Sequence, residues 1–301
     1  MNKKKLKNIA GLTLIEMMIG VIITSIIMAA MYTTYSVVNK TYSQVTDRAK
    51  ISRSGRDIIE MLMRDVRMSG FTYFLGINAD DHPTETYLEF LGGNVAPEDS
   101  HDPLIIIKNQ LGYTRVPAGA AAIPTVKWGA NDMCCDKIHI VYDDFNQHDD
   151  AQPYKRYKVT YFAEPYSEGG DQRYAVFKVK EYWQQPLTSN TGTWIKDCGE
   201  CYRALIRDHV VDMEFIPFDQ EGRVLLNSNT PGDKMDVMKL YKIRSVDIRL
   251  TFRSHKEFYR TQAKAGKPRT VKGLGERSRD YDDKFLRDSV VVTVHTRNIG
   301  T

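Results

Sequence analysis

The sequence predicts an α+β fold in which one long N-terminal helix packs against an antiparallel β-sheet. Three observations lead to this prediction. A run of mostly apolar residues, 12–31, lies near the start of the chain, and apolar residues then recur with a helical period up to about Met68. After Phe71 the period changes to two, which is typical of strands with one buried face. A helix with one apolar stripe and a sheet with one apolar face can bury these surfaces against each other.

A basic head precedes the apolar run. Residues 1–11 contain four lysines and no acidic residue, and these lysines account for the whole formal net charge of +4. The rest of the chain is balanced in charge, so we expect no bulk attraction to nucleic acid. The lysines are expected to stay in the cytoplasm while the chain beyond the apolar run is exported.

The apolar run itself predicts a membrane-spanning helix. About 20 apolar residues in a helix cross the ~30 Å hydrocarbon core of a bilayer. A cleavable secretory signal, cut near Ala29-Ala30, is the alternative, but the length of the run and the carboxylate of Glu16 within it argue against that. A charged residue in a membrane helix costs about 2.5–3.5 kcal/mol, so Glu16 marks a function or a missing partner.

The helix is predicted to continue beyond the membrane and to end at Gly70. Residues 32–68 contain no proline and a single glycine. Charged residues such as Arg64 and Asp65 fall largely away from the apolar stripe of this second half. That stripe, which is expected to pack on the exported sheet, comprises Ile51, Ile58, Ile59, Leu62 and Val66.

The junction between head and helix resembles a known processing signal. Gly11-Leu-Thr-Leu-Ile-Glu16 after a lysine-rich leader is similar to the class III signal of type IV pilins and of the pseudopilins of type II secretion. The resemblance implies a pilin-like fold, cleavage between Gly11 and Leu12 by a prepilin peptidase, and N-methylation of Leu12. It also implies that Glu16 is an assembly contact, neutralised by the amino group of Leu12 in a facing subunit, and a buried carboxylate does need such an opposite charge.

This resemblance divides the chain into a leader, a helix and an exported domain. Residues 1–11 are the expected leader and residues 12–70 the pilin helix, with 12–31 spanning the membrane. Residues 71–301 are the expected exported β-rich domain. The protein is then expected in the bacterial inner membrane with a periplasmic domain, and after assembly in a pilus at the cell surface.

Two further stretches resemble the PilW group of minor pilins. Residues 51–71 form an arginine-rich helix ending in Arg64-Asp-x-Arg-x-x-Gly70, and Val290–Asn298 is similar to that group's closing strand. The resemblance implies a subunit that helps to initiate pilus assembly and sits at or near the tip. Its implied partners are other minor pilins, the major pilin, the prepilin peptidase and a tip adhesin. A GspJ-like pseudopilin of type II secretion and a membrane-tethered binding module with an uncleaved anchor are the alternatives.

The exported domain is predicted to be mostly β-structure. In the clearest strand, 246–253, apolar residues alternate with polar ones, so one face is expected in the core and the other in water. Similar runs are Leu104–Lys108, Lys137–Tyr142, Tyr157–Phe162, Tyr174–Tyr182, Val210–Pro217 and Ser289–Arg297. The longest polar segment between strands, Ser254–Lys284, opens basic and closes acidic. We expect it to be a solvated loop, with a contact surface for another subunit or nucleic acid as the alternative.

Four cysteines lie in the exported part. Cys134 and Cys135 are adjacent, and Cys198 and Cys201 have CxxC spacing. Outside the cytoplasm disulfides are the expected state, with a zinc site or a redox enzyme as alternatives. The pairing stays open: two bridges between the pairs would join distant strands, whereas Cys198 to Cys201 would close a tight turn.

No pattern of catalytic residues is present. The histidines are scattered, and the sequence has no Ser/His/Asp spacing, phosphate-binding glycine loop or paired histidine ligands. We therefore expect a structural protein, not an enzyme, with no cofactor or metal. The acidic cluster 143–150 could hold calcium, but it lacks the glycine and distal glutamate of an EF-hand, so a solvated turn is the preferred interpretation.

Overall fold

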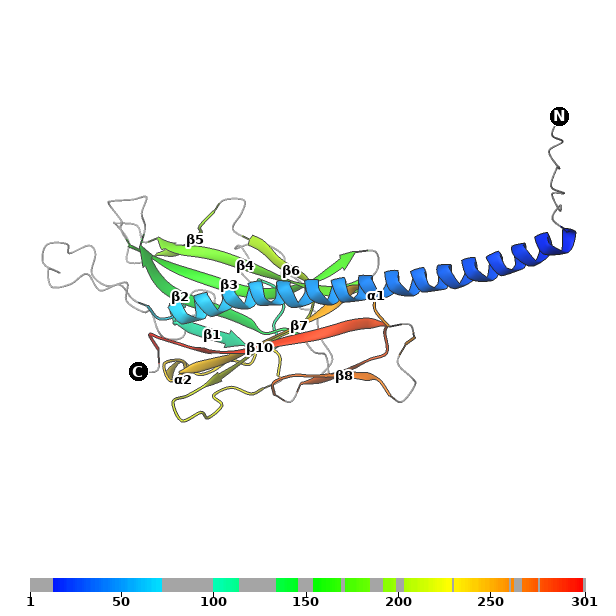
Figure 1. Cartoon of the computed structure of the whole chain (residues 1–301). Helices are drawn as coiled ribbons and strands as arrows, with labels where there is room; N and C mark the ends of the chain where they lie inside the picture. The colour runs from blue at the N-terminus through cyan, green and yellow to red at the C-terminus, as the bar shows by residue number, and fades with distance from the viewer. Residues whose placement is uncertain are drawn as a thin grey trace, which may run out of the picture. The chain divides into compact units, whose positions relative to one another are not determined.

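The structure, a computed structural model, describes eleven stretches of the chain. They are residues 13–71, 100–113, 134–145, 154–168, 171–184, 192–198, 203–228, 230–259, 261–262, 267–275 and 277–299. A helix, α1 (Leu14–Met68), opens the described chain and is followed mainly by strands (Figure 1). The chain forms two compact units, residues 1–49 and 50–301. Each unit is described by itself.

The second unit is built on one antiparallel sheet. Its path runs β1-β2-β3-β4-β6-β7-β10, and β5 pairs with β4 beside this path. The bounds are β1 (Leu104–Ile107), β2 (Lys137–Phe145), β3 (Tyr154–Glu168), β4 (Asp171–Gln184), β5 (Thr193–Lys196), β6 (Arg203–Phe218), β7 (Ser245–Glu257) and β10 (Phe285–His295). A short helix, α2 (Val237–Leu240), precedes β7, and β8 (Arg269–Lys272) pairs with β9 (Ser278–Tyr281) as a separate hairpin. The predicted α+β fold, a long helix followed by an antiparallel sheet domain, is confirmed.

The last turns of α1 lie on one face of this sheet. Ile58, Ile59, Leu62 and Val66 of the predicted stripe are buried in one apolar cluster with residues of the sheet. Gly55 makes a close approach possible, because a Cβ atom there would lie 2.9 Å from Cε2 of Phe252. Burial of aliphatic side chains at about 25 cal/mol per Å² is what holds the helix on the sheet.

The end of α1 follows the prediction. Gly70 has a φ of +73°, the left-handed conformation in which glycine commonly ends a helix. Its N–H donates to the carbonyl of Val141 at 2.9 Å, so the helix end is fixed to β2. The chain can therefore turn from the helix toward the sheet at this residue.

Asp65 differs from the expectation that it faces away from the packed stripe. Its side chain is buried and accepts a 2.6 Å hydrogen bond from the hydroxyl of Tyr161 and a 2.7 Å bond from Nζ of Lys178. Burial and the carboxylate of Asp65 raise the pKa of the Tyr161 hydroxyl, which therefore stays a donor. Helical position alone could not show that two strands bring partners to this carboxylate.

The outer face of β7 also differs from the prediction. Val246, Ile248, Leu250 and Phe252 are fully buried as expected, but Arg249, Thr251 and Arg253 on the opposite face are buried too. This face was expected to be wet. Residues of β10 contact these side chains: Ser289 lies 3.0 Å from Arg249 and 2.9 Å from Thr251, and the guanidinium of Arg253 lies over the ring of Phe285. Segment 254–284 is also not simply a solvated loop, because β7 continues to Glu257 and β8 and β9 form a hairpin within the segment.

Candidate assembly site at the start of the helix

The first unit consists, in its described part, of residues 13–49, which are helical from Leu14 on and mostly exposed. Its apolar side chains point outward: Leu14 is 78% exposed and Met31 is 66% exposed. The segment Leu14–Ala49 is long and apolar enough to cross a membrane. Its most apolar stretch has a mean hydropathy of 2.3, and none of that stretch is buried. Apolar surface of this extent requires a cover, and lipid or the helices of other chains can provide it.

Glu16 lies in the first turn of this helix and is bound by Thr13. The backbone N–H and the hydroxyl of Thr13 both donate to Oε2 of Glu16 at 2.9 Å. In return, the N–H of Glu16 lies 3.4 Å from the hydroxyl oxygen of Thr13. This reciprocal arrangement is a capping box, which satisfies N–H groups that have no partner within a helix. Thr13-Leu-Ile-Glu16 thus forms a helix start because Thr13 and Glu16 are three residues apart.

The capping box leaves part of the carboxylate available. Both bonds from Thr13 end on Oε2, and among the described residues no group donates to Oε1. The positive end of the helix dipole also favours a carboxylate at this place. Glu16 is therefore held in position with one oxygen facing outward, ready to accept from a donor on another molecule.

The predicted processing residues, Gly11 and Leu12, lie outside the described part of the chain. Cleavage after Gly11 and methylation of Leu12 stay predictions, as does the role of Glu16 as an assembly contact. The structure does show that the described helix begins at Leu14, directly after Thr13.

The cysteines do not form the long bridges that were weighed from the sequence. Cys134 and Cys135 are buried and bonded to each other. Cys198 is also disulfide-bonded, whereas Cys201 lies outside the described residues. With Cys134 and Cys135 paired, the two bridges that would join distant strands are not the arrangement present. That these disulfides form in the cell stays a prediction for chemical analysis.

The acidic cluster 143–150, for which a solvated turn was expected and calcium binding was the alternative, is only partly described. Asp143 is buried and forms a bidentate ion pair with Arg156, with distances of 2.7 and 3.1 Å. This carboxylate is therefore already neutralised. Residues 146–150 lie outside the described part.

A buried ionic cluster, which the sequence did not reveal, fixes the β8–β9 hairpin to the sheet. Arg277 pairs with Asp136 and, at 3.0 Å, with Asp212, and all three side chains are buried. Lys108 reaches Asp136 at 2.9 Å, and the N–H of Leu274 donates to Glu214 at 2.7 Å. The members come from distant parts of the sequence, so no local pattern could have marked them.

Comparison with known proteins supports the interpretation of the N-terminal end. Residues 6–32 match the family described as the prokaryotic N-terminal methylation motif. A comparison with curated protein sequences finds no match. Among solved structures, a type IV-like pilin from Thermus thermophilus is similar, with a TM-score of 0.40 and 8% sequence identity over 84% of this chain and 100% of that chain.

Proposed function

We propose that this chain is a subunit of a type IV pilus or of a related pseudopilus, and that its role is structural and not enzymatic. The observation that carries the proposal is Glu16. It is a carboxylate held by Thr13 in the first turn of an exposed apolar helix, within the residues that match the N-terminal methylation motif. A prepilin peptidase would remove residues 1–11 and leave Leu12 as a methylated N-terminus.

The physical role of Glu16 follows from the environment of a helix bundle. A carboxylate in an apolar medium is strongly disfavoured unless it is paired and hydrogen-bonded. Thr13 supplies hydrogen bonds but no charge, so the pair remains incomplete in a single chain. The positively charged amine of Leu12 in a neighbouring subunit would complete it, and it would do so only at one axial offset between the helices. Glu16 thereby sets the register of the subunit in the filament.

Within this class we propose a PilW-type minor pilin. Support comes from the arginine-rich helix 51–71 and the closing strand 290–298, which resemble that group. Such a subunit would initiate assembly together with other minor pilins, join the major pilin and sit at or near the tip, where an adhesin can bind. Its second unit would face the periplasm before assembly and the cell exterior afterwards.

The charge on Glu16 can be separated from its capping role by two substitutions. Glu16→Gln keeps the capping hydrogen bonds, because a glutamine at this position also forms a capping box, whereas Glu16→Ala removes both. We expect both variants to be exported and cleaved, and neither to enter sheared surface filaments, since both lack the charge. The measurement is an immunoblot of filaments from cells that lack the unsubstituted chain.

Ser25→Ala is the matched control for these variants. It removes a hydroxyl that bonds to the carbonyl of Val21 at 2.7 Å within the same helix, and its assembly should be normal. The proposed charge pairing would be contradicted if Glu16→Gln entered filaments at the level of the unsubstituted chain.

A further inference from the structure

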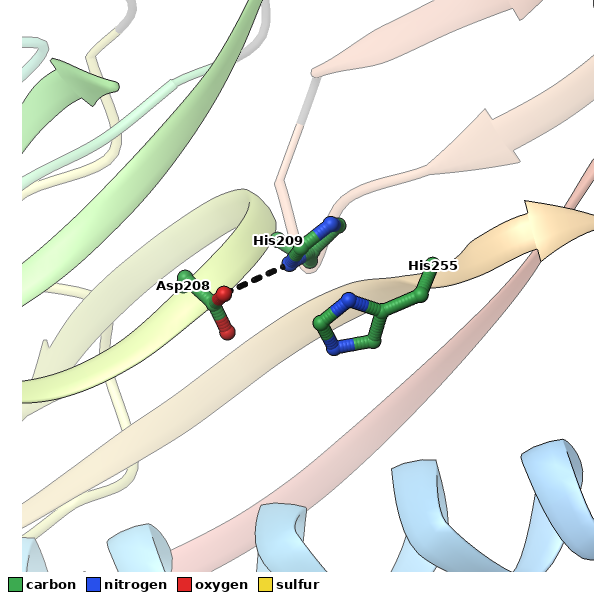
Figure 2. A group of neighbouring side chains, drawn as sticks. All are labelled: Asp208, His209 and His255. Atoms are coloured by element: carbon green, nitrogen blue, oxygen red, sulfur yellow. Dashed lines mark ion pairs between the residues drawn. The ribbon is translucent and has the colours of Figure 1, made fainter. Parts of the chain in front are cut away.

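Two histidines and an aspartate from two strands meet on the second unit. Asp208 and His209 lie on β6, and His255 lies on β7 (Figure 2). One nitrogen or oxygen atom of each lies within 4.8 Å of those of the other two. Nδ1 of His209 is 2.9 Å from Oδ2 of Asp208, and the two imidazole rings have their centroids 3.5 Å apart. These three side chains take no part in the proposed assembly contact.

An irregularity in β6 brings the first two side chains together. Consecutive residues in a regular strand point to opposite faces of the sheet. At this point, however, β6 shifts its register against both β4 and β7, and His209 has a φ of +56°. A bulge of this kind redirects one side chain. Asp208 and His209 can therefore face the same space, at the cost of a left-handed conformation in a residue other than glycine.

His209 carries a buried ring nitrogen that lies at ion-pair distance from Asp208 but outside hydrogen-bond geometry. Its side chain is 1% exposed, and Nδ1 has no partner in hydrogen-bond geometry although Asp208 is near. An unpaired buried polar group costs about 1–3 kcal/mol. Backbone strain and an unsatisfied ring nitrogen at the same residue indicate that this residue serves a ligand.

We propose that Asp208, His209 and His255 bind one divalent transition-metal ion of the zinc class. Two imidazole nitrogens and one carboxylate oxygen are donors that Zn²⁺ accepts, at about 2.0–2.2 Å from the metal. Two such ligands on one metal lie about 3 Å apart, as Nδ1 of His209 and Oδ2 of Asp208 already do. His255 must move inward to complete the set, and it is free to do so because its side chain is exposed.

Arg173 is the competitor of the metal at this site. Its Nη1 contacts Nε2 of His209, and because a guanidinium only donates, Nε2 accepts and Nδ1 carries the ring proton in the metal-free protein. When the metal takes Nδ1, that proton has to leave the site and Nε2 has to be released by Arg173. A glutamine at position 173 could instead accept a hydrogen bond from a protonated Nε2, the arrangement common in metal-ligating histidines.

The bound metal would fasten the end of β7 to β6. His255 lies where β7 enters the segment 254–284, whose hairpin is fixed further along by Arg277. Three protein ligands leave at least one coordination position for water. The metal site therefore has a structural role that is independent of filament assembly.

Titration of the full-length chain with Zn²⁺ tests the proposal. The protein is purified in detergent without a polyhistidine tag and with its cysteines oxidised, so that no tag and no free thiol can bind the metal. Calorimetry measures the affinity and stoichiometry for Zn²⁺, visible absorption of bound Co²⁺ reports nitrogen ligands, and Mg²⁺ serves as the comparison ion. We expect one Zn²⁺ per chain and no comparable binding of Mg²⁺.

The variants are expected to change the affinity for Zn²⁺ in opposite directions. His255→Ala and Asp208→Asn each remove one ligand near the surface and should weaken Zn²⁺ binding by more than the about 10-fold that loss of a group outside the ligand shell already costs. Arg173→Gln should strengthen it. His295→Ala, which removes an exposed histidine from β10, should leave it unchanged. Absence of Zn²⁺ binding, equal binding by His255→Ala and the unsubstituted chain, or equal losses in His255→Ala and His295→Ala would overturn the proposal.

Discussion

Glu16 and Asp212 are both carboxylates in largely apolar or buried surroundings, and they differ in whether their cationic partners lie within the chain. Glu16 is exposed on an apolar helix, where Thr13 binds only one of its oxygens. Asp212 is fully buried and lies 3.0 Å from Arg277 and 3.8 Å from Arg249. The first carboxylate is left for a partner outside the chain, whereas the second has its nearest cations within the chain.

Burial makes Asp212 sensitive to pH. Desolvation raises its pKa to about 7 from an ordinary value of 3.8, and it outweighs the opposing effect of Arg277. The folded protein therefore holds a proton that the unfolded chain loses between these two values, so the contribution of Asp212 to stability falls as the pH rises from about 4 to about 7. We expect the stability of Asp212→Asn to lack this decrease between about pH 4 and about pH 7. The free energy of unfolding, measured by denaturant titration at several pH values, gives the difference between the two proteins.

Asp236→Asn is the control for this measurement. The side chain of Asp236 is 82% exposed, so its substitution should leave the pH dependence unchanged. If unfolding free energies of the unsubstituted protein and Asp212→Asn run parallel from pH 4 to pH 7, the pKa of Asp212 is not raised.

The β8–β9 hairpin depends on one arginine for its attachment to the sheet. Arg277→Met leaves the carboxylates of Asp136 and Asp212 buried without this cation. Breaking a buried ion pair from one side costs about 3–5 kcal/mol, and we expect a loss of this size in the free energy of unfolding. Lys272→Met, an exposed position on the same hairpin, should change stability by less than about 0.5 kcal/mol. A loss below 1 kcal/mol for Arg277→Met would mean that the cluster does not hold the hairpin.

The close packing of α1 on the sheet depends on Gly55. A Cβ atom at this position would lie 2.9 Å from Phe252 and 3.1 Å from Val290. We expect Gly55→Val to destabilise the protein by about 1–3 kcal/mol through overpacking. Arg56→Val puts the same side chain at an exposed position of the same helix and should cost only the difference in helix propensity, about 0.5 kcal/mol. Thermal unfolding of both variants compares the two effects, and equal losses would contradict close packing at Gly55.

The long elements could be predicted because their patterns are local. Each of the seven runs assigned as strands from alternation overlaps a strand of the sheet, and the stripe from Ile58 to Val66 is buried as expected. The strands β5, β8 and β9 have four residues each, like β1, but β1 is entirely apolar whereas these three together contain mostly polar residues and show no long apolar run. The outer face of β7 was wrongly assigned to water because its polar residues contact side chains of β10, and alternation within one strand does not show what its neighbour contributes.

The same distinction applies to the candidate sites. Thr13 and Glu16 are three residues apart, so their sequence already contains the site. The Asp136–Asp212–Arg277 cluster and the Asp208–His209–His255 group are assembled by strand pairing and by a bulge in β6. The order of residues along the chain gives no sign of the Asp136–Asp212–Arg277 cluster. For the metal-site group, the adjacency of Asp208 and His209 is the one local sign.

Taken as a whole, the chain separates two tasks. Residues 13–49 present apolar surface and one incompletely paired carboxylate, which suits assembly among helices. In its described part, the second unit buries its own apolar core and pairs buried charges such as Asp136 and Arg277 with each other, which suits a domain exposed to water. On the proposed function, these tasks are joined by a cleavage that creates the amine at Leu12 and removes the basic leader.

The mature N-terminus tests this proposal most directly. The protein is isolated from cells that contain a prepilin peptidase, and the mass of its N-terminal peptide is determined. We expect a peptide that begins at Leu12 and carries an N-methyl group. A peptide that begins at Met1, or one that begins at Met31 as an ordinary secretory signal would produce, would contradict the assignment of this chain to the pilins.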